Sequence, residues 1–199
     1  MKTAPRPYHH GHLREALLRE AQRTLERSGV QSISLRELSR ELGVSQGAPR
    51  RHFAGKQALL DALAIRGFEQ FDQALKRATG KRGQDFKARL IKLARAYVGF
   101  ALKHPALLSL MFEAKQRPDS PRELLEASER AFSHGPATFA EAQAAGEVVP
   151  GDPARLALVV ISALLGLVSI STEGKFKGVS LDHLTGEIIE RMILGFSPR

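Results

Sequence analysis

The 199-residue sequence predicts an all-α protein with a small N-terminal three-helix unit, a long connecting helix and a larger C-terminal helical domain. Apolar residues recur at helical spacing along most of the chain, and no stretch shows the strict alternation expected of a half-buried strand. Capping residues and glycines divide this pattern into separate helices. A break rich in glycine and basic residues at 79–83 separates the two halves.

The first helix is predicted from an apolar stripe that starts at Leu13 and ends before Ser28-Gly29. A second start signal follows, because Ser34 and Glu37 have the spacing of a capping box. In that motif the serine and glutamate side chains each satisfy a free backbone N–H at a helix start. Three leucines at helical spacing support this second helix: Leu35, Leu38 and Leu42.

A tight turn and a third, short helix are expected next. Gly43 stands where a helix needs a left-handed residue to end, and Ser45 is placed to cap a helix running towards Phe53. Two short helices joined by such a turn have the size of a helix-turn-helix. Pro49 removes a backbone donor close to the start of the third helix, so an irregular beginning is expected there.

Longer helices make up the rest of the chain. A helix with one apolar side runs from about Gln57 to Ala78, before the break at 79–83. In the second half, Pro105 ends one helix, and Ser120-Pro121 begins another that Gly135-Pro136 must kink or interrupt. The expected ranges there are 86–103, 106–114, 120–145, 153–172 and 180–194.

The charge balance favours a polyanionic partner. The formal net charge is +9 with a pI of about 10.2, and residues 1–80 carry 14 Lys and Arg against 8 Asp and Glu. An excess in the N-terminal part is what a nucleic-acid module shows. The alternative is a basic surface that serves solubility alone.

Several function classes are disfavoured. The chain has no cysteine, which excludes disulfides and thiolate chemistry, and the segment before Gly11 lacks the apolar core of a signal peptide. The apolar run Leu156–Ser171 is shorter than the ~20 residues of a bilayer span, so we expect a core or interface helix and no membrane. No catalytic motif stands out, and neither an enzyme nor a cofactor is expected. Three histidines form a weak candidate metal cluster, for which no role is expected: His9, His10 and His12.

Several phrases along the N-terminal unit carry a family resemblance. They are Tyr8-His9-His10-Gly11 running into Leu13-Arg14-Glu15-Ala16-Leu17, then Ser34-Leu35-Arg36-Glu37-Leu38, Gly43-Val44-Ser45, and His52-Phe53-x-x-Lys56-x-x-Leu59-Leu60. With this spacing, residues 10–60 resemble the DNA-binding domain of the TetR family of bacterial transcriptional regulators. The resemblance implies a helix-turn-helix DNA-binding domain at 10–56 (its helix-turn-helix at 34–53), a connecting helix at 57–79 and a regulatory and dimerisation domain at 84–196.

Two features depart from the family pattern. Most members have a tyrosine three residues before the phenylalanine of the His-Phe pair, and the resemblance implies that it packs against a DNA phosphate. This chain has Arg50 there, which either grips phosphate through its charge or reaches a guanine edge. The C-terminal half resembles a subgroup named for a Trp-His-Gly motif through His104-Pro105-Ala106-Leu107 and Leu110-Met111-Phe112. Of that motif only Gly166 is kept, with Ile161 and Leu165 in the other two places.

The physical case for double-stranded DNA rests on the third helix. A major groove ~12 Å wide admits one helix, and a few side chains near its N-terminal half read base edges. Long hydrogen-bonding side chains without acidic neighbours suit this role, whereas flanking residues hold the backbone. The alternative is that the arginines face solvent and have a structural role only. The predicted DNA-binding residues are Ser34, Arg36, Ser45, Gln46, Gly47, Arg50, Arg51, His52 and Lys56, with Lys2 and Arg6 on an N-terminal arm.

A homodimer is expected because one helix-turn-helix contacts only a handful of bases. A two-fold dimer presents two reading helices ~34–36 Å apart and demands a palindromic operator. The apolar run near the C-terminus is apolar nearly all round, so a partner helix is expected to cover its outer side. The predicted interface residues are Leu156, Val160, Leu164, Leu167, Ile188, Ile189 and Met192.

The resemblance further implies a cytoplasmic, nucleoid-associated repressor that an unidentified small apolar ligand releases. An aromatic and methionine set is expected to line its pocket, or simply to fill the core: Phe100, Leu107, Met111, Phe112, Phe132 and Phe139. Two other functions stay open. One is a DNA-associated protein that tolerates many sequences and has no ligand control. The other is a helical module that binds another protein and has no affinity for DNA.

Overall fold

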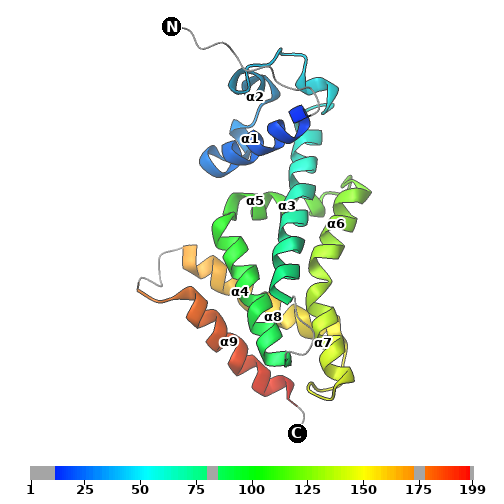
Figure 1. Cartoon of the computed structure of the whole chain (residues 1–199), viewed down its shortest axis with the longest axis vertical. Coiled ribbons are helices and arrows are strands. Elements are labelled where there is room, and N and C mark those ends of the chain that lie inside the picture. The colour runs from blue at the N-terminus through cyan, green and yellow to red at the C-terminus, as the bar shows by residue number, and fades with distance from the viewer. Residues whose placement is uncertain (1–11, 80–84, 173–177, 198–199) are drawn as a thin grey trace. The chain divides into compact units, whose positions relative to one another are not determined.

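The computed structural model describes residues 12–79, 85–172 and 178–197, and within these ranges every regular element is a helix (Figure 1). The chain divides into two compact units. Unit 1 is Met1–Phe68 with His104–Glu126, and unit 2 is Glu69–Lys103 with Ala127–Arg199. The predicted all-α fold is therefore confirmed.

Unit 1 is built around the apolar face of α1 (Leu13–Ser28). Its other elements are η2 (Val30–Ser32), α2 (Leu35–Glu41), η3 (Pro49–Arg51), α5 (Pro105–Gln116), the first part of α3 (Lys56–Thr79) and the first part of α6 (Arg122–Phe132). Helix α1 contacts α2, η3 and α5. An ion pair of 2.9 Å between Glu15 and Arg66 joins α1 to α3, so one helix holds the small elements of this unit together.

Helix α5 is fixed at its start by a carboxylate from α1. The Glu26 side chain accepts hydrogen bonds from the backbone N–H groups of Ala106 (3.3 Å) and Leu107 (3.4 Å), and it lies 3.6 Å from His104 Nδ1. The first N–H groups of a helix have no partner within it and carry partial positive charge, so a carboxylate there is favourable. Helix α5 also packs closely against α3 at Gly67.

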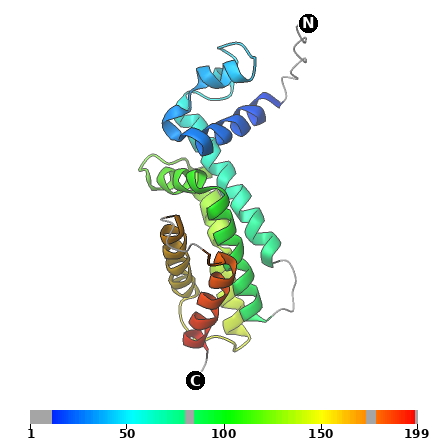
Figure 2. The ribbon, with the colours of Figure 1, turned by 90° about the vertical axis from the view of Figure 1, so that its left-hand side faces the viewer.

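Unit 2 surrounds α4 (Phe86–Lys103), which contacts the other three long helices of the unit. These are α7 (His134–Ala144), α8 (Pro153–Thr172) and α9 (Leu181–Phe196), and Figure 2 shows α8 and α9 side by side next to α4. Aromatic rings fill the space between the helices. Phe71 of α3 packs edge-on against Tyr97 at 5.6 Å, and Phe139 packs edge-on against Phe196 at 5.3 Å.

Most predicted helix boundaries agree with the structure to within a few residues. The interruption expected near Gly135-Pro136 is confirmed, because α6 ends at Phe132 and α7 begins at His134. One start signal acts differently. The Ser120 hydroxyl donates to the carbonyl oxygens of Ala114 (2.6 Å) and Arg117 (2.7 Å), so it closes the end of α5.

Candidate functional site

Helix α2 begins and ends at the residues that the sequence pointed to. The Ser34 hydroxyl accepts a hydrogen bond of 3.2 Å from the Glu37 backbone N–H. The reciprocal half of the capping box is absent, because the Glu37 carboxylate pairs with Arg40 instead. At the other end Gly43 has φ +65°, and the N–H groups of Gly43 and Val44 donate to carbonyl oxygens of the last turn. This Schellman end turns the chain sharply after α2.

The segment after this turn is less helical than expected. Ser45 does not cap an α-helix; a turn leads to the 3₁₀-helix η3, whose N-cap is Ala48. Pro49 explains the difference, because it has no N–H to donate to the Ser45 carbonyl as an α-helix would require. That carbonyl instead accepts from Ala48 at 3.0 Å. Pro49 and Phe53 are buried and anchor the segment in unit 1.

All of the predicted DNA-binding residues that surround this segment lie on the surface. Pro49 and Phe53 are buried between runs of these exposed residues, while the polar side chains face solvent. The exposed set is Ser34, Arg36, Ser45, Gln46, Gly47, Arg50, Arg51, His52 and Lys56. Their contact with DNA stays a prediction, and the arm residues Lys2 and Arg6 lie outside the described residues.

Three arginine side chains of this region form no ion pair with the described residues. Glu41 pairs with Arg27 of α1 at 3.7 Å, and Lys56 donates to the carbonyl of Gln31 at 3.3 Å. Among the described residues, no hydrogen bond or ion pair engages the exposed side chains of Arg36, Arg50 and Arg51. No acidic residue occurs from Val44 to Lys56, so this surface carries uncompensated positive charge.

The candidate metal cluster falls mostly outside the described residues, which include His12 but not His9 or His10. His12 is the N-cap residue of α1 and makes no side-chain cap hydrogen bond. In ranges 12–79, 85–172 and 178–197, no group of three His, Cys, Asp or Glu residues is gathered as a metal ion would need.

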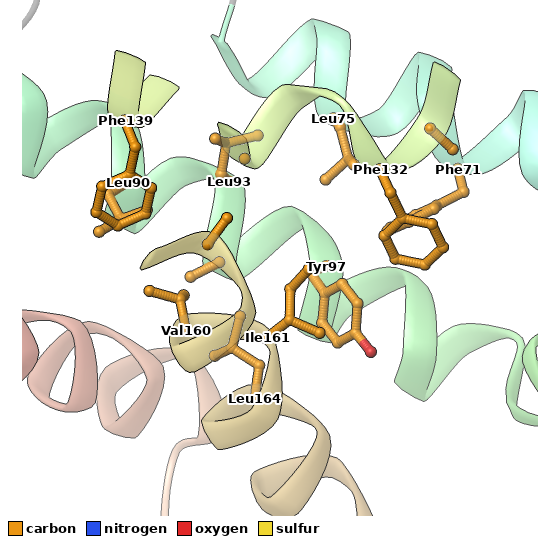
Figure 3. A pocket seen from close by; sticks show the side chains of 14 residues that line it. Phe71, Leu75, Leu90, Leu93, Tyr97, Phe132, Phe139, Val160, Ile161 and Leu164 are labelled. Atoms are coloured by element: carbon orange, nitrogen blue, oxygen red, sulfur yellow. The ribbon is translucent and has the colours of Figure 1, made fainter. Parts of the chain in front are cut away.

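A cavity lies inside unit 2, enclosing about 450 Å³ of empty space with its open mouth included. Five helices contribute to its wall, and every lining side chain but one is apolar. The exception is Tyr97. The lining residues are Phe71, Leu75, Leu90, Leu93, Ala94, Tyr97, Ala131, Phe132, Gly135, Phe139, Ala157, Val160, Ile161 and Leu164 (Figure 3).

The predicted pocket residues divide between the two units. Phe132 and Phe139 line the cavity, and Phe100 packs against the lining residue Phe71 with ring centroids 5.1 Å apart. Leu107, Met111 and Phe112 belong to α5 in unit 1 and are not among the lining residues of this cavity. Sequence reasoning missed Tyr97, because a lone tyrosine in an apolar helix gives no signal that sets it apart from core.

The predicted interface residues lie mainly on the inner side of α8 and α9. Four of them, Val160, Leu164, Leu167 and Ile189, are buried within the chain, and Leu156, Ile188 and Met192 are half-buried. Helix α8 is apolar on all sides, so its sequence could not show which face turns inward. The large apolar side chains that α8 and α9 leave exposed, here called the outer face, are Leu158, Val159, Leu165 and Ile170 of α8 and Leu194 of α9.

Length and composition alone would let α8 cross a membrane, and only 22% of Pro153–Ser171 is buried within the described structure. Its outer side is therefore largely exposed among the described residues. The inner side packs against α4, α7 and α9.

Comparison with known families gives two matches. Residues 17–63 match the family model described as bacterial regulatory proteins, tetR family. Residues 90–196, more than half of the chain, match the model described as a tetracyclin repressor-like C-terminal domain.

Individual proteins show the same likeness. The uncharacterized HTH-type transcriptional regulator YobS of Bacillus subtilis is 35% identical over 81 residues, which make up 40% of this chain and 41% of that protein. The class C tetracycline repressor protein of Escherichia coli is 47% identical over 51 residues, 26% of this chain and 23% of that protein. The matched stretch thus spans less than half of either relative.

A solved structure extends the likeness to the whole chain. A protein of unknown function from Rhodococcus sp. RHA1 is 41% identical, with a TM-score of 0.91, over 98% of this chain and 100% of that chain.

Proposed function

The chain belongs to the TetR family of bacterial transcriptional regulators, and from this premise we propose that it is a dimeric repressor that binds a palindromic operator and leaves it when a small apolar ligand binds. We assign DNA binding to residues 10–56 and ligand binding and dimerisation to residues 84–196, joined by the helix at 57–79. One observation carries the DNA-binding part. Residues 45–53, here called the recognition segment, are held by buried Pro49 and Phe53, while the polar residues around them are exposed and three arginines make no hydrogen bond or ion pair with the described residues.

The contacts divide into two kinds. Ser34 accepts a hydrogen bond from Glu37, so its own O–H proton is free to donate to a phosphate oxygen at the start of α2. Arg36 and Lys56 add positive charge beside it. Gln46 and Arg50 reach the base edges, and Arg50 recognises guanine through two parallel hydrogen bonds. Phosphate contacts set the position of the protein on DNA, and base contacts set the sequence.

Two copies are joined through the outer face of α8 and α9. Leu158 and Val159 are 61% and 52% exposed, and Leu194 is 78% exposed. Burial of apolar area contributes roughly 25 cal/mol per Å², so covering these side chains in a two-fold contact favours association. Because such a contact is self-complementary, it brings two recognition segments into symmetric positions.

Ligand control requires a difference in affinity between two states of the dimer. A ligand shifts the equilibrium only if it binds the state that is misplaced for DNA more tightly than the competent state. The cavity of unit 2 supplies such a site, because Phe71 and Leu75 of α3 belong to its wall. A ligand that repositions α3 acts on the helix whose first residue, Lys56, follows the recognition segment in the chain.

The decisive experiment captures DNA. Purified protein is mixed with fragmented DNA from its source genome, and bound fragments are recovered and sequenced. We expect a shared palindrome with half-sites one helical turn apart. Fragments without a shared sequence, retained with steep salt dependence, would instead establish the protein as a DNA-associated protein that tolerates many sequences. No retention at all would contradict both functions.

Matched variants locate the contact. Arg50→Ala is expected to weaken operator binding by roughly ten-fold to a hundred-fold and to relax preference at one base pair in each half-site. Arg51→Ala, if it loses a phosphate contact, lowers the slope of log affinity against log salt by about 1 for each subunit. Arg122→Ala removes the same charge from α6, outside the helix-turn-helix, and serves as the control. Equal losses of affinity in all three variants would mean that DNA binding depends on the net charge of the protein and not on a specific contact of Arg50 or Arg51.

The dimer is tested separately by sedimentation at several concentrations. Leu158→Glu places a charge on the outer face of α8 and is expected to give a monomer with weakened operator binding. Leu125→Glu, at a side chain 39% exposed on α6, is the control and should leave the association unchanged. A Leu158→Glu protein that remains a dimer would place the interface elsewhere.

A further inference from the structure

A basic side chain of α1 lies against the end of the recognition segment. The guanidinium carbon of Arg14 is 5.6 Å from the centroid of the Phe53 ring, an arrangement in which the ring attracts the cation. Phe53 is buried and directly follows the exposed residues Arg51 and His52. Helix α1 also contacts η3 within unit 1. Arg14 therefore lies beside the surface to which we assign DNA contacts.

The charge of Arg14 is only weakly compensated. Among the described residues its ion-pair partner is Glu15, but the distance from Nη1 to Oε1 is 3.9 Å, which is too long for a hydrogen bond. The other carboxylate oxygen of Glu15 lies 2.9 Å from Arg66 Nη1, so this carboxylate is engaged mainly with α3. The Arg14 side chain is 53% exposed. An ion pair within the protein therefore does not account for its position.

The contact with Phe53 limits the directions in which Arg14 can point. A long arginine side chain loses rotamer freedom when it binds an anion, and a side chain already held against a ring has less freedom left to lose. The ring covers the guanidinium from one side only, so N–H groups on the solvent side stay available as donors. The planar guanidinium matches two oxygens of a phosphate through parallel hydrogen bonds.

We propose that Arg14, held in place by Phe53, donates hydrogen bonds to a DNA phosphate beside the end of the recognition segment. This inference rests on the proposed function, because it requires DNA to bind at residues 45–53. It goes further in adding a residue of α1 to the DNA-contact surface. The contact sets the position of the protein on DNA and reads no base.

The competing role for Arg14 is structural. If the side chain serves only to cover the Phe53 ring, its removal lowers the stability of the protein and leaves the salt dependence of DNA binding unchanged. A phosphate contact has the opposite signature. Each phosphate that a cation neutralises releases counterions, so losing one such contact lowers the slope of log affinity against log salt by about 1.

The test measures binding of the full-length protein to a DNA fragment retained in the capture experiment, by fluorescence anisotropy at several salt concentrations. The variants are Arg14→Ala, Arg14→Lys and Arg19→Ala. Arg19 is the matched control, because it is also exposed on α1 but points about 140° away from Arg14 around the helix axis. Urea unfolding without DNA measures the stability of each variant separately.

We expect Arg14→Ala to weaken binding about ten-fold, as a hydrogen bond between charged groups contributes, and to lower the salt slope by about 1 for each bound subunit. The loss should be the same on a fragment with an altered base pair. Arg14→Lys keeps the charge but not the paired N–H geometry, so it should retain the slope and bind more weakly than the wild type. Arg19→Ala should keep the affinity and slope of the wild type.

Three results would overturn the inference. The first is an Arg14→Ala protein that binds as tightly as Arg19→Ala. The second is a loss of affinity without a change of slope, which would mean that Arg14 only supports the fold of the segment. The third is an equal change of slope in Arg14→Ala and Arg19→Ala, which would mean that net charge alone is responsible.

Failure of this inference can be told apart from failure of the proposed function. If the wild type retains no DNA, DNA binding itself falls and the Arg14 contact falls with it. If the Arg50→Ala and Arg51→Ala proteins lose affinity while Arg14→Ala does not, DNA binding at the recognition segment stands and only the Arg14 contact falls.

Discussion

The contact between α3 and α5 in unit 1 makes a sharp prediction about stability. Gly67 lies in the interior of α3, and a Cβ atom added there would lie 2.7 Å from Met111 Sδ, 2.9 Å from Met111 Cγ and 3.2 Å from Leu107 Cδ1. The first two distances are shorter than van der Waals contact allows. Met111 and Leu107 are both fully buried, so a shift of either side chain must be taken up by the residues packed around it.

Two opposing terms set the size of the effect of Gly67→Ala. Replacing glycine by alanine inside a helix gains about 1 kcal/mol of helix propensity. Inserting a methyl group into a packed core costs about 1–3 kcal/mol. The expected result is a net loss of about 1 kcal/mol. Gly99 is the matched control, because it also lies inside a helix but its added Cβ would meet nothing within 4 Å. Gly99→Ala should therefore gain about 1 kcal/mol.

Urea unfolding followed by circular dichroism measures both variants, and the separation between them should be about 2 kcal/mol. The reasoning attributes the loss to Met111, so shortening that side chain must remove it. In a Met111→Ala background, Gly67→Ala is expected to be neutral or stabilising. If Gly67→Ala alone stabilises the protein as much as Gly99→Ala does, the close packing of α5 on α3 is refuted.

Three further predictions concern single groups. The pKa of Tyr97 is raised by burial to about 12 from an ordinary value of 10, so the unfolded chain loses this proton first; the folded state keeps its full stability below pH 10 and loses about 2–3 kcal/mol as pH rises to 12. Urea unfolding across this range should show the loss in wild type and a smaller one in Tyr97→Phe; identical curves would count against it. Arg117 donates to both carboxylate oxygens of Asp61, at 2.7 and 3.3 Å, in a half-buried pair. Asp61→Asn should cost about 1–3 kcal/mol in urea unfolding, whereas Glu126→Gln, at the exposed pair with Arg122, should change stability by less than about 0.5 kcal/mol. Ser34→Ala removes the N-cap of α2 and should cost about 1 kcal/mol, measured in the same way, with Ser109→Ala on the exposed face of α5 as the control.

Local signals in the sequence were enough to place nearly every helix. Caps such as Ser34, stops such as Gly43 and breaks such as Gly135-Pro136 act through the backbone of a few neighbouring residues, so they can be read without tertiary context. The recognition segment shows the limit of this reasoning. Pro49 predicts an irregular start, but its full effect, a turn and a 3₁₀-helix in place of an α-helix, also depends on the burial of Pro49 and Phe53.

Side-chain orientation on uniformly apolar helices could not be predicted. Helix α8 has apolar residues on every face, so periodicity did not show that Val160 and Leu164 turn inward while Leu158 and Val159 turn outward. The aromatic set is divided between the two units for a related reason. Phe132 and Met111 are both large apolar residues, so the sequence does not distinguish them. The first nevertheless lines the cavity of unit 2, and the second packs in unit 1. Which helices meet is a tertiary property that the amphipathic pattern of one helix does not contain.

The 3₁₀ geometry of the recognition segment bears on what Arg50 can do. In an α-helix, successive side chains point about 100° apart, so Arg50 and Arg51 already start in different directions. A 3₁₀-helix has three residues per turn and separates them by about 120°, which divides their tasks still more strongly. If Arg50 enters the groove to read a base, Arg51 is therefore directed to the flanking backbone. The two variants should accordingly differ in kind, with a change of sequence preference for Arg50→Ala and a change of salt dependence for Arg51→Ala.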